Sequence, residues 1–349
     1  MKINDLEFFL VEIGRTNLLA PVRSLLVRLT TDQGWEGWGE AAVPWRPGEL
    51  AARRDVLLAV LAGRSVYDIE ELHLLDVLAP APLRSAVEMA CWDLMGRLLG
   101  QPLCNLLGGA YRRRVPLAVG LGSGRPHRLA RFARELASQG YHCQTITSSG
   151  QMELDRLLVS AVREAVGDAV QLRLDAEAHY EMETVRDLCA ALEYERLQFL
   201  LDPLDTRELY PVASLGRQTT VPLAVWRAVR SPADVLAAAR CGAASSVVID
   251  LEQVGGISPA RSCTAVATAA GIAALVGGRP ALGISTAAML HLAAATPSLS
   301  GANPCAYHEL RDDVLAEPLQ IVGGMMGVPQ GPGLGIEVER GKVEQYAVE

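Results

Sequence analysis

Two hydroxyl-bearing residues, Thr145 and Thr147, alternate along the apolar run Cys143–Thr147. Residues two apart in a strand share one face, and in a parallel barrel the carboxyl ends of the strands carry the catalytic side chains. A threonine hydroxyl is not a general base near neutral pH unless a neighbouring group takes its proton. The spacing therefore predicts two hydroxyls that face a barrel interior and do not remove protons themselves.

The elements that must position these hydroxyls are short apolar runs, each followed by a helical stretch. Seven runs are evident and an eighth is weaker: Val115–Val119, Cys143–Thr147, Val170–Asp175, Leu197–Asp202, Val221–Trp226, Ser246–Asp250, Ile272–Val276 and Ser298–Asn303. Strands that alternate with helices at this spacing predict a parallel sheet, and about eight repeats predict an α/β fold, a (β/α)8 (TIM) barrel. A doubly wound open sheet is the rival, but no glycine-rich phosphate loop follows an early strand.

The chain before and after these repeats follows a different pattern. Residues 1–40 alternate apolar and polar positions, and residues 49–109 are helical in pattern. We therefore expect an α+β capping domain over 1–113 and a barrel over 114–316. The turn-rich segment 317–349 is too apolar for a disordered tail, so we expect it to return to the cap.

Composition excludes several classes of function. The chain has 349 residues, is 50% hydrophobic and carries a formal net charge of −8, which disfavours nucleic acid and anionic membrane surfaces as partners. Its seven cysteines have no paired or zinc-like spacing, and it has no signal peptide or membrane-length apolar stretch. We expect a soluble cytoplasmic protein with free thiols.

Several local strings, in this order, resemble the enolase superfamily, specifically its mandelate racemase/muconate-lactonizing enzyme family. The strings are Gly37–Glu40, Ala86–Gly96, Leu106–Gly109, Val254–Ile257, His291–Pro297 and Gly331–Glu337. The resemblance implies a capped barrel in which three acidic residues on successive strands hold Mg²⁺. It also implies lysine bases on the second and sixth strands, which remove a proton next to a carboxylate.

Carried over by position, the resemblance places Asp175 and Asp202 at the first two metal-ligand positions. Glu177 stands where the family has Asn. The third ligand position is Trp226, and Arg227 follows it. Indole cannot ligate a hard cation, and arginine remains charged and would repel one. We therefore expect no cofactor, although two carboxylates and water leave weak Mg²⁺ binding open.

The lysine positions are also changed. The second strand has Thr145 and Thr147, and the sixth-strand lysine position is Asp250. The seventh-strand acidic position is Ala281, with Arg279 nearby. We hypothesise that Arg227 replaces the charge of the metal and pairs with Asp202 or Asp175, since a guanidinium suits carboxylate contacts.

Other residues are weaker candidates. His142 and His179 lie near strand ends and are possible bases, whereas His291 lies in an apolar helical run and is expected in the core. The loop Arg15–Arg23 is expected to cover the barrel mouth, as the specificity loop of the family does.

Three functions follow. The first is a pseudoenzyme or small-anion binder that has lost proton abstraction. The second is an active isomerase with altered, metal-free chemistry on a carboxylate, and the third is an ordinary Mg²⁺-dependent cycloisomerase, racemase, epimerase or dehydratase. The expected partners are a small carboxylate ligand and other copies of the chain.

Overall fold

The computed structural model describes residues 1–16 and 19–348. The chain begins with a three-stranded antiparallel sheet in the order β1 (Ile3–Ile13), β2 (Val22–Thr31), β3 (Glu36–Ala41). Glycine is required in β3 because the sheet lies directly on a helix, α3 (Ala81–Leu99). A Cβ atom at Gly39 would lie 1.8 Å from the Ala86 carbonyl oxygen. This close contact explains the aromatic-glycine string of the sequence.

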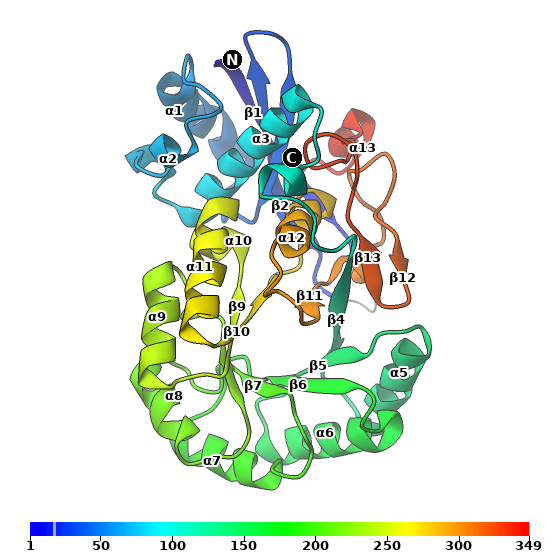
Figure 1. Cartoon of the computed structure of the whole chain (residues 1–349). Helices are drawn as coiled ribbons and strands as arrows, with labels where there is room; N and C mark the ends of the chain where they lie inside the picture. Colours follow the sequence, from blue (N-terminus) through cyan, green and yellow to red (C-terminus); the bar gives the residue numbers. More distant parts are fainter. Residues whose placement is uncertain (17–18, 349) are drawn as a thin grey trace.

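The remaining helices of the first 113 residues pack around this sheet and α3. They are η1 (Pro47–Glu49), α1 (Leu50–Leu61), α2 (Ile69–Leu72), η2 (Asp76–Leu78) and α4 (Leu103–Leu106). The apolar side chains of α1, α2 and η2 form a core with β1, β2 and α3, whereas the buried Leu103 and Cys104 of α4 belong to the core of the barrel. The cap is the upper, blue and cyan part of Figure 1.

Eight strands and the helices between them form the barrel, the lower part of Figure 1. The strands are β4 (Arg114–Gly122), β5 (Cys143–Thr147), β6 (Gln171–Asp175), β7 (Phe199–Leu201), β8 (Leu223–Val225), β9 (Ser246–Ile249), β10 (Ala273–Val276) and β11 (Asn303–Pro304). The helices are α5 (Pro126–Ser138), α6 (Met152–Val166), α7 (Met182–Ala191), α8 (Leu209–Gly216), α9 (Pro232–Cys241), α10 (Leu251–Val254), α11 (Ile257–Ala270) and α12 (Gly283–Ala295).

Neighbouring strands from β4 to β10 pair in parallel in chain order. The short strand β11 closes the ring: it pairs with β4 in parallel, and its Asn303 Oδ1 accepts a hydrogen bond of 2.9 Å from the backbone N–H of Val276 at the end of β10. The (β/α)8 prediction is confirmed, including the weak eighth run, which forms a strand only at its last residue and the one after it.

The C-terminal segment contacts both parts of the molecule. After the turn η3 (Tyr307–Glu309), β12 (Ile321–Val322) and β13 (Met325–Gly327) form a hairpin that pairs antiparallel with the first half of β4. The chain then returns to the cap through α13 (Arg340–Gln345), and the Val348 N–H donates to the Leu10 carbonyl of β1. Both termini therefore lie at the cap end (Figure 1).

Buried carboxylates of the cap bind the amino ends of barrel helices. Glu88 of α3 accepts hydrogen bonds from the N–H groups of Ile257 (2.6 Å) and Ser258 (2.9 Å), which begin α11. Glu40 of β3 accepts from the N–H groups of Leu282 and Ser285 at the start of α12. Because the first N–H groups of a helix have no partner within it, these acids satisfy donors that docking would otherwise bury unpaired.

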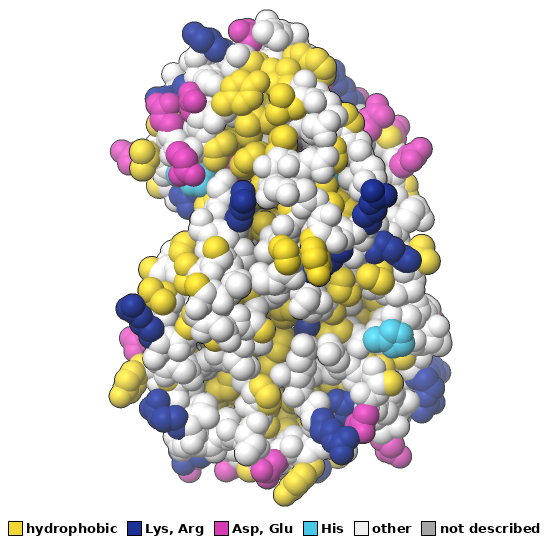
Figure 2. All heavy atoms as spheres, in the orientation of Figure 1, with side chains coloured by type: hydrophobic (Ala, Val, Ile, Leu, Met, Phe, Trp, Pro, Cys, Tyr) yellow, Lys and Arg dark blue, Asp and Glu magenta, His cyan; other side chains and the backbone are white. Residues whose placement is uncertain are grey.

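Among residues 1–16 and 19–348, no helix has both the length and the apolar character that crossing a membrane requires. The seven cysteines are free thiols, as predicted. On the face in Figure 2, basic and acidic side chains are interspersed, and a notch separates cap from barrel at the left edge. The expected self-association stays a prediction.

Candidate functional site

A cavity of about 740 Å³ opens at the carboxyl ends of the barrel strands. Five of the residues that the sequence singles out line it: Thr145, Thr147, Asp175, Glu177 and Trp226. Arg15 and Thr16 of the predicted covering loop also line it, while residues 17 and 18 of that loop lie outside the described part. A second, much smaller cavity nearby is lined by Asp250, Arg279 and Ala281.

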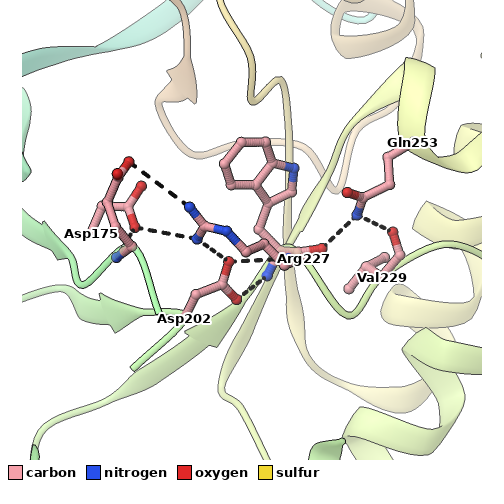
Figure 3. Close-up of polar contacts among 7 residues, drawn as sticks. Asp175, Asp202, Arg227, Val229 and Gln253 are labelled. Atoms are coloured by element: carbon pink, nitrogen blue, oxygen red, sulfur yellow. Dashed lines mark hydrogen bonds and ion pairs between the residues drawn. The ribbon is translucent and has the colours of Figure 1, made fainter. Parts of the chain in front are cut away.

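The guanidinium of Arg227 lies among three carboxylates (Figure 3). Its Nη1 is 2.9 Å from Asp202 Oδ2 and 3.8 Å from Asp175 Oδ1, and its Nη2 is 3.9 Å from Glu177 Oε1. The ion pair predicted for Arg227 is therefore present. Asp175 ends β6, Glu177 follows it, Asp202 follows β7 and Arg227 follows β8, so adjacent strand ends bring the four charges together.

The backbone around Arg227 is held from two sides. Asp202 accepts hydrogen bonds from the N–H groups of Trp226 (2.9 Å) and Arg227 (3.1 Å) in addition to the guanidinium. The Gln253 amide, on α10, donates to the carbonyl oxygens of Trp226 and Val229, both at 2.7 Å (Figure 3). These contacts fix the main chain from which the Arg227 side chain reaches the acids.

Burial disfavours the ionised form of the carboxyl groups in this cluster. Burial raises the pKa of Asp175 to about 6, although a hydrogen bond from the Glu177 N–H and the charge of Arg227 act against it. Burial also raises the pKa of Asp202, against the N–H donors of Trp226 and Arg227. A carboxyl group that titrates near neutrality in a cavity is able to exchange protons with a bound ligand.

Asp175 is expected to lower stability as the pH rises. Its pKa is higher in the folded chain than the ordinary 3.8, so the folded state binds more protons and loses stability between about pH 4 and pH 6. The free energy of unfolding falls by up to about 3 kcal/mol over this pH range. Urea unfolding from pH 4 to 8 should show a weaker decline for Asp175→Asn, while the exposed Asp187→Asn should follow the wild type.

Asp250, which the resemblance assigns to a lysine position, caps a helix. It is the N-cap residue of α10, and its Oδ1 accepts hydrogen bonds from the N–H groups of Glu252 (2.9 Å) and Gln253 (3.3 Å). Its buried Oδ2 has no hydrogen-bond partner among the described residues and lies 4.0 Å from Nε of Arg279, whose side chain is about half exposed. The proposed ligand contacts of Arg279 and Ala281 stay predictions.

The candidate histidines lie away from the cavity. His142 directly precedes β5, so it lies at the opposite, amino end of the barrel strands, and the prediction that it is a base is wrong. His179 follows β6 but is exposed and does not line the cavity. His291 is buried and contacts the Cys104 N–H and the Leu334 carbonyl, as predicted for a core residue, and burial lowers its pKa to about 4.

Two features of the cavity were missed by sequence reasoning. Arg173, buried on β6, lines the cavity, stacks 4.8 Å from the Phe199 ring and donates to Gln198 and to the Ala302 carbonyl. Its position two residues before Asp175 on one strand was an available signal. At the rim of the cavity, Arg15 Nη1 lies 2.8 Å from Glu309 Oε2. This ion pair joins segments far apart in the chain, so no local sequence pattern predicts it.

The oxygen donors present here do not fit Mg²⁺, which prefers six oxygen ligands in near-ideal octahedral geometry. Both oxygens of Asp202 already accept N–H donors, and the guanidinium lies between Asp202 and Asp175. Trp226, at the third ligand position, offers no oxygen. Within the described part of the chain, no group of three or more His, Cys, Asp or Glu residues has a metal-holding arrangement.

The chain is a capped-barrel protein. Its eight-stranded barrel is covered by an α+β cap and carries charged residues at the carboxyl ends of its strands. The family model for the mandelate racemase/muconate lactonizing enzyme N-terminal domain matches residues 19–108, and the enolase C-terminal domain-like model matches 128–342. The chain therefore belongs to the mandelate racemase/muconate-lactonizing enzyme family of the enolase superfamily.

Individual relatives agree with this assignment. Muconate cycloisomerase 1 of Rhodococcus opacus is 30% identical, covering 92% of this chain and 90% of the relative. The N-succinyl-L-Arg/Lys racemase of Bacillus cereus is 24% identical, covering 93% and 90%. Among solved structures, an enolase of Streptomyces coelicolor superposes with a TM-score of 0.90 at 29% identity, covering 99% of this chain and 96% of that one. Muconate lactonizing enzyme of Pseudomonas putida reaches 0.92 at 23% identity over all of both chains, which shows the shared fold.

Proposed function

We propose that the chain is an isomerase-type protein that binds a small carboxylate in the barrel-mouth cavity, with arginine rather than Mg²⁺ supplying the positive charge. The observation that carries this proposal is the guanidinium of Arg227, which lies between Asp175 and Asp202. The cavity volume of about 740 Å³ suits a small ligand.

A second positive charge lies at the floor of the cavity. Arg173 is 1% exposed, and no carboxylate among the described residues lies within ion-pair distance of it. A charge that is buried without a counter-ion attracts an anion more strongly than one in water. The side chains of Trp226 and Phe199 contribute apolar surface to the cavity wall. The expected ligand is therefore a carboxylate with an apolar portion.

Turnover of the ligand is favoured by the relatives, whose names are those of cycloisomerases, racemases, epimerases and dehydratases. In this chain Asp175 is the candidate proton carrier because its pKa is raised by burial to about 6 and it faces the cavity. A proton taken from the carbon next to the ligand carboxylate would leave negative charge, which Arg173, a lining residue of the cavity, and Arg227, 3.8 Å from the Asp175 carboxylate, would stabilise.

Binding without turnover is the second candidate function, and the residues at the ends of the barrel strands support it. The second strand offers two hydroxyls, Thr145 and Thr147, where the family has lysines, and Asp250 is engaged as a helix cap. None of these three groups is an evident strong base.

One experiment separates the candidates. Calorimetry with a panel that includes muconate and N-succinyl amino acids measures binding, and NMR in D₂O measures deuterium incorporation next to the carboxylate. We expect at least one ligand to bind and exchange, and Asp175→Asn to slow exchange by about 100-fold while affinity changes little. The exposed Asp187→Asn serves as the matched control. Binding without exchange would select the second candidate, and no binding at all would refute both.

A further inference from the structure

We propose that the ligand carboxylate binds on the floor of the cavity, where the Arg173 guanidinium and the Thr145 hydroxyl donate hydrogen bonds to it, and that the ligand is a monocarboxylate. The inference rests on the proposed function and adds to it the orientation of the ligand and its charge. The same titrations test both, but different results would contradict them.

Neighbouring strands contribute one layer of residues to the lower part of the cavity. Gly120 of β4 pairs with Thr145 of β5, and Thr145 pairs with Arg173 of β6. Arg173 in turn pairs with Phe199 of β7, and all four residues line the cavity. Paired residues of neighbouring strands point to the same face of a sheet. The layer therefore places a hydroxyl next to a guanidinium, and Gly120 leaves space beside them because it has no side chain.

The guanidinium of Arg173 is held in place and still has a nitrogen without a partner. Its Nε donates to Gln198 Oε1 at 2.7 Å and its Nη2 to the Ala302 carbonyl at 2.8 Å, and both acceptors are neutral. Its buried Nη1 has no hydrogen-bond partner in the described part of the chain. A buried charge with an unpaired donor destabilises the fold, whereas a hydrogen bond from a guanidinium to a carboxylate is short and strong. A carboxylate in the cavity would supply the missing acceptor and the missing counter-charge together.

The positive charges nearer the mouth of the cavity are already balanced by carboxylates of the chain. Arg15 is paired with Glu309 at 2.8 Å. The guanidinium of Arg227 contacts three carboxylates, at 2.9, 3.8 and 3.9 Å, so acidic groups outnumber basic ones there. A second negative charge, at the end of the ligand that faces the mouth, would be repelled by these acids. This balance favours a ligand whose outer end is neutral.

The same orientation suits Asp175 as the proton carrier. Asp175 is two residues beyond Arg173 on β6, and both side chains line the cavity. Asp175 is therefore roughly 6.5 Å nearer the mouth on the same face of the strand. With the carboxylate on Arg173, the carbon next to it lies between the two side chains. A proton on this carbon would pass to Asp175, and the electron pair left behind would be delocalised into the carboxylate that Arg173 binds.

The test is calorimetric titration of full-length protein with three ligands that share one apolar portion. Hydrocinnamate carries one carboxylate, hydrocinnamide carries none, and para-carboxyhydrocinnamate carries a second carboxylate at its far end. For the wild type we expect hydrocinnamate to bind about tenfold more tightly than either of the others. The amide cannot pair with the charge of Arg173, and the dicarboxylate brings a second negative charge to the acidic mouth.

Variants of the two proposed binding residues make the result specific. Arg173→Met removes the charge but keeps an unbranched side chain, and it should weaken hydrocinnamate binding by about 10- to 100-fold. Thr145→Val keeps the shape without the hydroxyl and should weaken binding by about 2- to 10-fold. Arg128→Met, at an exposed arginine of α5, is the matched control for the loss of one positive charge and should bind as the wild type does. Circular dichroism and thermal unfolding establish that each variant is folded.

Three outcomes would overturn the inference while the proposed function stands. One is a folded Arg173→Met chain that binds hydrocinnamate as tightly as the wild type. If Arg173→Met does not fold, unchanged affinity in Thr145→Val is the contradicting result. The third is a wild type that binds the dicarboxylate more tightly than hydrocinnamate. A wild type that binds no carboxylate at all would refute the proposed function, and this inference with it.

Discussion

Glu88→Ala is expected to lower the free energy of unfolding by about 3–5 kcal/mol, the largest effect of any single substitution considered for this chain. Glu88 is 0% exposed, and its carboxylate accepts hydrogen bonds from the N–H groups of Ile257 and Ser258 and from the Trp92 indole. Alanine would leave two backbone donors at the start of α11 buried without acceptors.

Urea unfolding of full-length protein measures this loss. Glu88→Gln keeps one acceptor oxygen and should lose about half as much, whereas Glu70→Ala, at an exposed position of the neighbouring helix α2, should change stability by less than about 0.5 kcal/mol. An effect of Glu88→Ala as small as that of Glu70→Ala would mean that the cap does not depend on this contact for its docking.

Arg227→Ala is expected to destabilise the chain by about 2 kcal/mol at pH 8 and by clearly less at pH 5. The value lies below the usual 3–5 kcal/mol for breaking a buried ion pair, because the Arg227 side chain is 33% exposed and Asp202 retains two N–H donors. Burial raises the pKa values of Asp202 and of Asp175, the latter to about 6. An acid with a raised folded pKa lowers the free energy of unfolding progressively as the pH rises from its ordinary pKa to its folded pKa, so the unpaired acids cost less at pH 5 than at pH 8.

The measurement is urea unfolding at both pH values in a chelating buffer, so that adventitious metal does not compensate. The control is Arg230→Ala, which should stay within about 0.5 kcal/mol of wild type. An equal loss at pH 5 and pH 8 would indicate that Arg227 acts through packing on Trp226, whose ring lies 5.2 Å away, rather than through its charge.

The helix cap at Asp250 illustrates how a local signal can be present and still be overlooked. Asp250 is followed three residues later by Gln253, the pattern of a helix start. In the structure Asp250 does cap α10, but Gln253 turns away from it to hold the carbonyls of Trp226 and Val229.

The alternation of apolar runs and helical stretches was enough to predict the barrel. Each apolar run shows by its own composition that its residues are buried in a strand, and this inference does not depend on knowing which distant residues it contacts. Residue types were likewise enough to predict that Arg227 pairs with Asp202 or Asp175, since three unpaired acids at adjacent strand ends require a cation. The tertiary structure alone decided two things: the contact of Glu309 with Arg15 and the capping of α11 by Glu88. Each of these joins segments far apart in the chain, and such contacts depend on how the elements pack, which no local pattern of residues encodes.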